Sequence, residues 1–268
     1  MTQAPRRIVI TRPAGEAAAL AAHVREAGGE PLLFPVIEIQ DAPAPELAAL
    51  DAVIARLDTF DLALFISPSA VDKAMTRIHA QRQSQSKSPW PARLRCAAIG
   101  PGGVRALQRF GITEVIAPDA ADGRFDSEAL LASPFMQAVR GQRVVLFRGN
   151  GGRELLAQTL TARGTIVEAV SCYQRAIPQQ DATPLLQAWA RGEVAAVIVT
   201  SSEGLRNLLH MTGAAGAAYL RDTPVVVPHP RIAAVARAQG CLQVLQSPPG
   251  DAALARTALL AITQDNSG

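Results

Sequence analysis

The sequence predicts an α/β protein built from two doubly wound parallel-sheet domains, and three observations lead to that prediction. Short β-branched runs alternate along the chain with Ala-, Leu- and Arg-rich stretches of helical period. Most of the runs are apolar on both faces, which is typical of central parallel strands covered by helices. The chain also repeats itself, because Ile8–Ile37 aligns without a gap on Val144–Tyr173.

The predicted strands follow from the apolar runs, taken in chain order. Each run is short and lies between turn-forming residues, as expected of a strand between connections. The predicted strands are Arg7–Thr11, Leu32–Ile39, Leu62–Ser67, Cys96–Ile99, Glu114–Ala117, Arg143–Arg148, Thr165–Tyr173, Ala195–Thr200, Pro224–Val227 and Leu242–Leu245. Stretches between them, such as Glu16–Ala27 and Glu154–Arg163, carry apolar residues at spacings of three and four and are predicted helices.

The repeat continues beyond the first strand and helix of each half. Leu64–Ser67 matches Ile198–Ser201, and Pro101–Gly111 matches Pro230–Gly240. The simplest interpretation is one five-strand unit present twice. Within the repeat, Arg12 aligns with Arg148 and Gly15 aligns with Gly151, so the turns that follow the first strands correspond.

Two predicted strands, Leu32–Ile39 and Thr165–Tyr173, are longer than their neighbours, and each is second in its half. Pro35 within the first of them argues against a continuous central strand. We therefore expect each to begin in one sheet and continue as a connector, so that the halves exchange their first βαβ units. The predicted domains are 1–36 with 177–268, and 42–168, with connector strands at 37–41 and 169–176.

Composition excludes several classes of protein. An apolar fraction of 49% is too high for a disordered chain, and a net charge of +3 is too small for a dedicated nucleic-acid arm. Three cysteines cannot form a disulfide framework. The longest aliphatic runs are too short to span a bilayer, and no secretory signal is evident at the start. We expect a soluble, reduced, cytoplasmic protein.

The glycine-rich turn Arg148–Arg153 is the first candidate site. Glycines at a strand end let backbone N–H groups approach an anion, although a tight turn alone also explains them. The turn is not a P-loop, because no Gly-Lys-Ser/Thr follows, and Glu154 breaks the dinucleotide fingerprint. The matching turn Thr11–Gly15 favours the anion interpretation, since Arg12 and Arg148 would both face the ligand crevice of an open α/β sheet.

Two hydroxyl turns, Ser67–Ser69 and Thr200–Ser202, form the second candidate set. Ser and Thr are ordinary helix N-caps, and a cap can also contact a carboxylate, so both interpretations stay open. Among the histidines only His229 ends a predicted strand. Neither a Cys/His metal spacing nor a Ser/His/Asp set is present.

Taken in order, these motifs resemble the uroporphyrinogen-III synthase family over about residues 7–260. The resemblance rests on Thr11–Pro13, Pro35–Ile39, Phe60–Asp61, Ser67–Val71, Ala98–Pro101, Leu146–Arg153, Cys172–Arg175 and Val199–Ser202. It implies two α/β domains joined by a two-stranded connector and flanking a cleft that holds the active site. The implied activity is that of a cofactor-free lyase of haem biosynthesis, which dehydrates and cyclises hydroxymethylbilane while inverting ring D.

The resemblance also implies site residues. Tyr173 occupies the family's tyrosine position and would assist departure of the substrate hydroxyl, although an aromatic that only packs the connector is the alternative. The implied substrate contacts are Arg12, Ser67, Ser69, Gly100, Arg148, Gly149, Gly151, Thr200, Ser201, His229, Pro230 and Arg231. Arginine forks and strand-end amides suit a polycarboxylate, and catalysis by orientation needs no strong acid or base.

Two departures from the family pattern are visible. Ile66 replaces the first hydroxyl residue of a Thr-Ser pair, and His229–Ile232 replaces a Gly-Pro-Thr-Thr turn, where Arg231 would substitute as a carboxylate donor. The main alternative function is a non-catalytic two-domain binding or sensor protein for an organic polyanion, while a nucleotide oxidoreductase is disfavoured. We expect a monomer that binds a linear tetrapyrrole and has no metal, nucleic-acid or membrane partner. A transient contact with the preceding pathway enzyme is compatible with this expectation.

Overall fold

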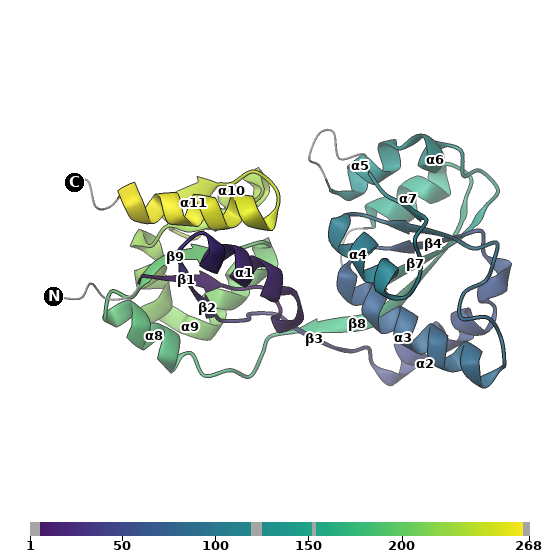
Figure 1. Cartoon of the computed structure of the whole chain (residues 1–268), viewed down its shortest axis with the longest axis horizontal. Coiled ribbons are helices and arrows are strands. Elements are labelled where there is room, and N and C mark those ends of the chain that lie inside the picture. Colours follow the sequence, from purple (N-terminus) through teal and green to yellow (C-terminus); the bar gives the residue numbers. More distant parts are fainter. Residues whose placement is uncertain (1–5, 119–124, 152–153, 265–268) are drawn as a thin grey trace. The chain divides into compact units, whose positions relative to one another are not determined.

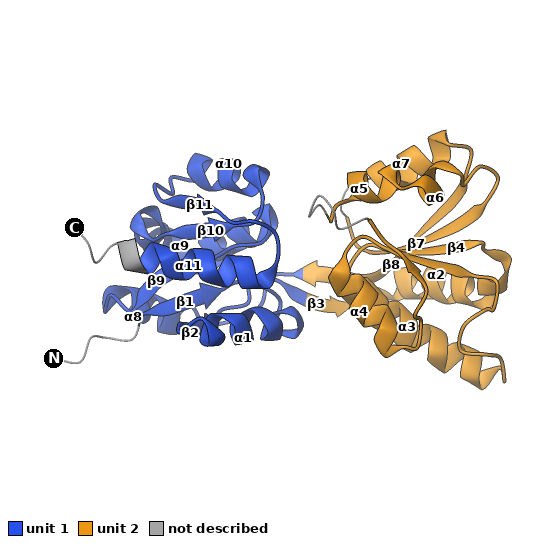
Figure 2. Cartoon of the chain, turned by 45° about the horizontal axis from the view of Figure 1, so that its top comes forward, with its two compact units in different colours: residues 1–38, 176–268 blue, residues 39–175 orange. Residues whose placement is uncertain are grey.

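The computed structural model describes residues 6–118, 125–151 and 154–264. The chain divides into two compact units, one within Met1–Glu38 and Ala176–Gly268 and the other within Ile39–Arg175 (Figure 2). The chain therefore passes between unit 1 and unit 2 twice, once after Glu38 and once after Arg175.

Unit 1 is built on a five-stranded sheet with the order β11-β10-β9-β1-β2, and its paired strands are parallel. The strands are β1 (Arg7–Ile10), β2 (Glu30–Leu33), β9 (Val194–Ile198), β10 (Val225–Val227) and β11 (Val244–Gln246). The helices are η1 (Ala14–Glu16), α1 (Ala18–Glu26), α8 (Thr183–Ala190), α9 (Ser202–Asp222, interrupted at Gly213), α10 (Pro230–Ala238) and α11 (Asp251–Gln264).

Helices cover both faces of this sheet. Helices α1 and α11 lie side by side and share one core with Ile8, Ile10 and Ile198 (Figure 1). Val9 and Val197 alternate with these residues along their strands and are also fully buried, so the opposite face of the sheet is covered as well. Burial on both faces accounts for the continuous apolar runs of the sequence.

Unit 2 is built on a six-stranded sheet with the order β3-β8-β7-β4-β5-β6. The strands are β3 (Glu38–Asp41), β4 (Leu62–Phe65), β5 (Arg95–Ala98), β6 (Val115–Ile116), β7 (Arg143–Gly149) and β8 (Ile166–Ala176). The helices are α2 (Ala44–Ala55), η2 (Leu57–Thr59), α3 (Pro68–Ser84), α4 (Pro101–Arg109), α5 (Ser127–Ala132), α6 (Pro134–Gln137) and α7 (Leu155–Ala162).

Alternate strand residues of unit 2 enter two different cores. Phe65 and Phe147 stack at a centroid distance of 4.8 Å in the core formed with α2, α3 and α4. Leu64 and Leu146 enter the core formed with α5, α6 and α7 on the opposite face. The sheet is thus covered by helices on both sides, and its strand ends are the open edges where loops meet.

The strand orders confirm the predicted α/β class with parallel sheets in two domains. The unit β1-α1-β2 completes a sheet with β9–β11, whereas β7-α7-β8 completes a sheet with β4–β6, so the first βαβ units of the two halves are exchanged. Unit 2 holds one strand more than the expected five, and the additional strand is β3.

The two long predicted strands behave differently from each other. The predicted strand Leu32–Ile39 was wrong as a single element, because β2 ends at Leu33 and β3 begins at Glu38. Pro35 lies in the break, and proline has no N–H to donate to a neighbouring strand. The second long strand, β8, is continuous from Ile166 to Ala176 and pairs with β7 along its first part.

Candidate active site

The predicted site residues of unit 2 lie at the carboxyl ends of parallel strands. Ser67 follows β4, Gly100 follows β5, and Arg148 and Gly149 end β7. Tyr173 on β8 lies opposite Gly149 in the register of the two strands. Because these strands run parallel, the fold brings residues distant in sequence to one edge of the sheet, where open α/β sheets bind ligands.

A β-bulge turns Tyr173 toward the core of unit 2 at this end of the sheet. Arg148 pairs with Ser171 and the next residue, Gly149, pairs with Tyr173, so Cys172 is the extra residue on β8. In a regular strand Cys172 and Tyr173 would face opposite sides, yet both are buried in the core shared with α3. Since a bulge re-aims the side chains that follow it, this extra residue sets the direction of the phenol. The side chain of Tyr173 is only 1% exposed.

The ring of Tyr173 lies directly against Gly149. A Cβ atom added at Gly149 would lie 2.6 Å from the Cε2 and Cζ atoms of the ring, so no larger residue fits without a shift. The backbone N–H of Asn150 donates a hydrogen bond of 2.9 Å to the carbonyl oxygen of Tyr173. The glycine-rich turn therefore has a packing role toward the phenol, and its predicted anion-binding role stays a prediction.

Ser67 caps a helix and contacts Tyr173 at the same time. Its Oγ accepts a hydrogen bond of 3.0 Å from the backbone N–H of Ala70, which is an N-cap interaction for α3. The same Oγ lies 3.0 Å from the phenolic oxygen of Tyr173. Ser69 is buried in the first turn of α3, and Gly100 is the N-cap residue of α4 without a side-chain cap.

Arg148 forms an ion pair that the sequence did not reveal. Its Nη1 lies 2.7 Å from Oε1 of Glu154, and the side chain of Arg148 is only 19% exposed. Gly151 lies between them with a φ of 69°, in the left-handed region where glycine is favoured. Gly152 and Arg153 of the predicted turn lie outside the described residues. An anion at Arg148 must therefore share this guanidinium with Glu154 or displace the carboxylate.

The corresponding edge of unit 1 has the same construction. Arg12 follows β1, and its Nη2 pairs with Oδ1 of Asp251 at 2.8 Å. Ser201 follows Thr200 at the end of β9 and caps α9 by accepting a hydrogen bond of 2.9 Å from the backbone N–H of Gly204. Two hydroxyl turns and two arginines thus occupy equivalent places in the two sheets, as the sequence repeat predicts.

The predicted site after β10 is also a helix cap. His229 is the N-cap residue of α10, and its Nδ1 accepts a hydrogen bond of 3.1 Å from the backbone N–H of Arg231. Pro230 is the first residue of the helix, where its missing N–H costs no hydrogen bond. The side chain of Arg231 is exposed. A histidine nitrogen thus replaces the hydroxyl usually found at such a cap.

Sequence reasoning included Asn150 in the glycine-rich turn and Arg175 in a family motif, but it predicted no role for either residue beside Tyr173. Nη2 of Arg175 lies 3.4 Å from the phenolic oxygen, and the Arg175 guanidinium carbon lies 5.9 Å from the centre of the ring. The backbone N–H of Arg175 donates a hydrogen bond of 2.9 Å to Oδ1 of Asn150. The available signal was the period of two along a strand, which places Tyr173 and Arg175 on the same face of β8.

The cysteines supply no nucleophile to this region. Burial raises the pKa of the Cys96 and Cys172 thiols to about 12, and burial also raises the pKa of Cys241. A thiol with so high a pKa stays protonated near neutral pH, and the protonated form is not the nucleophile. Among the residues that the structure describes, no group of three or more His, Cys, Asp and Glu side chains could hold a metal ion.

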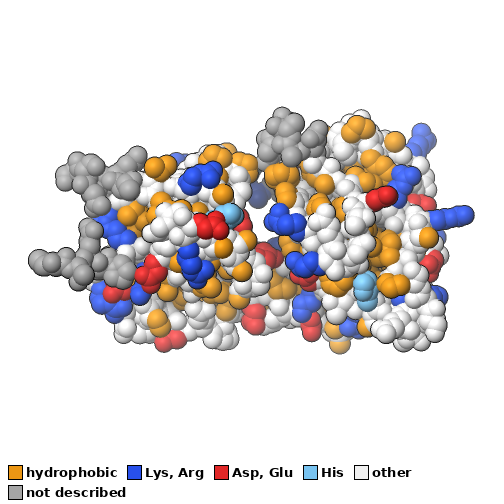
Figure 3. Space-filling view, in the orientation of Figure 1, with side chains coloured by type: hydrophobic (Ala, Val, Ile, Leu, Met, Phe, Trp, Pro, Cys, Tyr) orange, Lys and Arg blue, Asp and Glu red, His pale blue; other side chains and the backbone are white. Residues whose placement is uncertain are grey.

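Charge and hydropathy give no further site on the visible surface. Basic and acidic side chains are interspersed on the face of each unit shown in Figure 3 (Figure 3). None of the helices in the described part of the chain is both long enough and apolar enough to cross a membrane.

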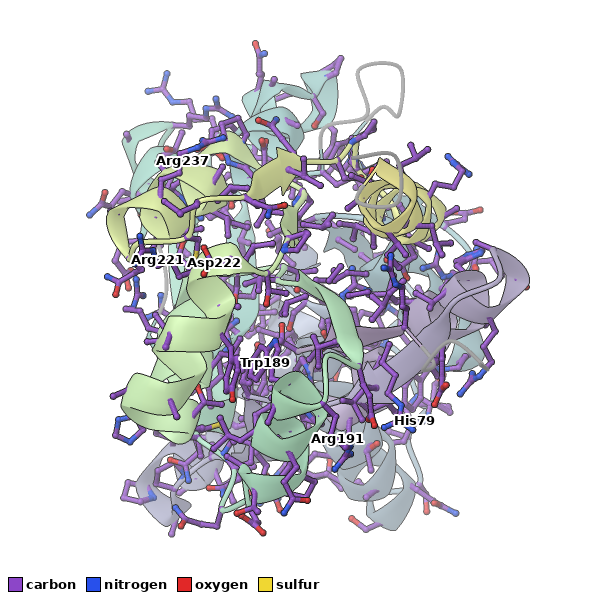
Figure 4. The ribbon with its side chains drawn as sticks, turned by 90° about the vertical axis from the view of Figure 1, so that its left-hand side faces the viewer. His79, Trp189, Arg191, Arg221, Asp222 and Arg237 are labelled. Carbon is purple, nitrogen blue, oxygen red and sulfur yellow. The ribbon has the colours of Figure 1, made fainter. Side chains whose placement is uncertain are left out.

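Two cavities lie at the opposite, amino-terminal edges of the sheets. In unit 1 a cavity of about 290 Å³ is lined by residues that include Trp189 and Asp222 (Figure 4). In unit 2 an open cavity of about 910 Å³ is lined by residues that include Arg95 and Glu114. Neither cavity is lined by a predicted site residue.

Comparison with known proteins gives a consistent result. A family model described as uroporphyrinogen-III synthase HemD matches residues 18–254. The uroporphyrinogen-III synthase of Salmonella typhimurium is 38% identical over 205 residues, which are 76% of this chain and 79% of that protein. The uroporphyrinogen-III synthase of Escherichia coli is 35% identical over 201 residues, or 75% of this chain and 78% of that protein.

Solved structures share the fold at lower sequence identity. A mutant uroporphyrinogen III synthase from Thermus thermophilus superposes with a TM-score of 0.61 at 20% identity, covering 97% of this chain and 99% of its own. A uroporphyrinogen-III synthetase from Helicobacter pylori gives a TM-score of 0.59 at 14% identity, covering 95% and 99%. These likenesses support the two-domain α/β fold.

Proposed function

The chain belongs to the uroporphyrinogen-III synthase family, and from this premise we propose that it converts hydroxymethylbilane to uroporphyrinogen III in haem biosynthesis. The reaction removes water from the linear tetrapyrrole and closes the ring with inversion of ring D. The observation that supports this function most directly is the family match over 18–254, which includes the strand ends of unit 2 and those of unit 1 except the end of β1.

The reaction is that of a lyase, and Tyr173 is its proton donor. The bond between the hydroxymethyl carbon and its oxygen breaks, and the oxygen leaves as water with the phenolic proton of Tyr173. The pyrrole nitrogen stabilises the resulting azafulvenium cation, and ring D attacks it to form a spiro intermediate. Fragmentation and reclosure invert ring D, and the proton lost in the last step returns to the phenolate. General acid catalysis of this kind contributes about 10²–10⁴-fold to a rate.

The arginines and strand-end groups bind the substrate carboxylates. The proposed contacts are Arg12, Ser67, Ser69, Gly100, Arg148, Gly149, Gly151, Thr200, Ser201, His229, Pro230 and Arg231. Two of the arginines are already paired, Arg12 with Asp251 and Arg148 with Glu154. When substrate binds, each of these two arginines therefore exchanges a protein carboxylate for a substrate carboxylate. Such an exchange favours specificity and orientation of the substrate over a large gain in binding energy.

The remaining proposals concern the state of the protein. We expect it to work without a cofactor, because pyrrole chemistry supplies both the electrophile and the nucleophile and the protein mainly fixes the conformation of the substrate. We expect a cytoplasmic monomer that exchanges substrate transiently with the enzyme that makes hydroxymethylbilane.

The test of the proposed function is the isomer formed. Freshly made hydroxymethylbilane is incubated with the protein, the products are oxidised, and the type I and type III isomers are separated by chromatography. Uncatalysed closure gives the non-inverted type I isomer, so the expected result is type III well above the control without protein. Type I alone, at the control rate, would contradict the proposed function and favour a binding protein.

A further inference from the structure

Among the residues that the structure describes, two side chains place a polar atom near the phenolic oxygen of Tyr173. One is Oγ of Ser67 at 3.0 Å, and the other is Nη2 of Arg175 at 3.4 Å. A guanidinium only donates hydrogen bonds, so the Arg175 contact must use a lone pair of the phenolic oxygen. Oγ of Ser67 accepts from the backbone N–H of Ala70, and its own hydroxyl can either donate to the second lone pair of the phenolic oxygen or accept the phenolic proton.

When both neighbours donate, the phenolic proton of Tyr173 has no partner among them. In that arrangement it points away from Ser67 and Arg175. If Arg175 is removed, the phenolic oxygen loses a cationic donor, so negative charge on this oxygen is stabilised less well.

The position of Arg175 is fixed by its own strand. The bulge at Cys172 turns Tyr173 toward the core, and the period of two then places Arg175 on that face and Gln174 on the other. Gln174 accordingly turns to β3, where its Nε2 lies 3.3 Å from Oε1 of Gln40. Asn150 accepts from the backbone N–H of Arg175 at 2.9 Å, so the turn after β7 also holds this residue.

We propose that Arg175 is a positioning residue that acts through Tyr173: its guanidinium donates to the phenolic oxygen and stabilises the negative charge that forms there when the phenolic proton passes to the departing substrate hydroxyl. This inference rests on the proposed function. As the carbon–oxygen bond breaks and water leaves with the phenolic proton, negative charge forms on the Tyr173 oxygen. The Arg175 cation above the ring stabilises that charge until the proton returns.

The test is a comparison of Arg175→Gln, Arg175→Lys and the double variant Arg175→Gln/Tyr173→Phe. We expect Arg175→Gln to lower kcat for type III formation by about 10- to 100-fold with KM changed less than about twofold, because a charge-assisted hydrogen bond to the reacting group is lost. Arg175→Lys keeps a cationic donor and restores part of the kcat. In the Tyr173→Phe background, Arg175→Gln has no further effect on kcat, since the two residues act as one unit.

A matched control separates this role from the general effect of removing a positive charge. Arg109 in the same unit pairs with Asp72 on the surface, and Arg109→Gln is expected to keep wild-type kcat and KM. Far-ultraviolet circular dichroism and the unfolding midpoint of each variant show that the fold is retained, which is expected because the side chain of Arg175 is exposed.

Three results would overturn the inference while leaving the proposed function intact. They are a wild-type kcat for Arg175→Gln, a change confined to KM, and a loss of kcat that persists in the Tyr173→Phe background. The last two would assign Arg175 to direct binding of the substrate. Absence of type III product from the wild-type protein is a separate outcome, because it would overturn the proposed function and this inference with it.

Discussion

The ring of Tyr173 lies so close to Gly149 that a single added methyl group would reach to within 2.6 Å of two ring atoms. The phenol is also hydrogen-bonded through its oxygen to Ser67, and it is almost fully buried. The placement of the proposed proton donor therefore depends on the absence of a side chain on the neighbouring strand as much as on the tyrosine itself.

Gly149→Ala is expected to displace the phenol. Insertion of a methyl group into a packed core costs about 1–3 kcal/mol, and here the ring must move because the methyl group is attached to the backbone. We expect a lower free energy of unfolding in urea and a kcat reduced by at least about tenfold. Gly15→Ala in unit 1 is the control, because a Cβ there meets no atom within 4 Å. Equal stability and kcat for Gly149→Ala and wild type would contradict this prediction.

Tyr173→Phe removes the phenolic oxygen and keeps the ring. We expect kcat for type III formation to fall by about 100-fold or more while KM changes little, because the proposed acid is lost and the carboxylate contacts remain. The sequence holds two tyrosines. The second, Tyr219, stacks on Trp189 in unit 1, and Tyr219→Phe serves as the control with wild-type kinetics. An unchanged rate for Tyr173→Phe would remove this residue from the mechanism.

The fold was predictable because its signals are local and repeated. Each strand is short and apolar on both faces, and the alignment of Ile8–Ile37 on Val144–Tyr173 shows that the two halves share one plan. Pro35 indicated where a long strand would fail, but the sequence did not show that the residues after it would add a strand to the sheet of unit 2.

The detailed site was less predictable because it depends on contacts between distant residues. The pairing of Arg12 with Asp251 and the contact of Ser67 with Tyr173 join parts of the chain that only the sheet order brings together. The bulge at Cys172 has no marker in the sequence, and without it the period of two would direct Tyr173 to the opposite face. The residue types at the strand ends could thus be predicted from the sequence, whereas the residues that they contact could not.

Arg231→Ala tests whether the unusual turn after β10 binds substrate. Arg231 is exposed at the start of α10, where the family pattern has a hydroxyl residue, and it is proposed to donate to a substrate carboxylate. We expect KM to rise by about tenfold, since hydrogen bonds to charged groups contribute about 1.5–3 kcal/mol, with a smaller change in kcat. Arg237→Ala in the last turn of the same helix is the control, labelled in Figure 4. Wild-type KM for Arg231→Ala would contradict its role in binding.

The buried thiols predict a loss of stability in alkaline solution. Burial raises the pKa of Cys96 and Cys172 from 9.0 to about 12. The unfolded chain therefore releases these protons near pH 9, while the folded protein keeps them until about pH 12. Between these values the unfolded state binds fewer protons, so the free energy of unfolding falls as pH rises, by at most ~1.4 kcal/mol per pH unit for each thiol.

Urea unfolding at several pH values between about 9 and 11 measures this slope, and the variant Cys96→Ala/Cys172→Ala should show a shallower one. Met136→Ala is the matched control, because it removes a fully buried side chain of unit 2 that does not titrate. It is expected to lower stability at every pH and to keep the wild-type slope. If the double variant retained the wild-type slope, the two thiols would not be the source of the alkaline destabilisation. If Met136→Ala changed the slope equally, the change in pH dependence would instead result from a general loosening of the core.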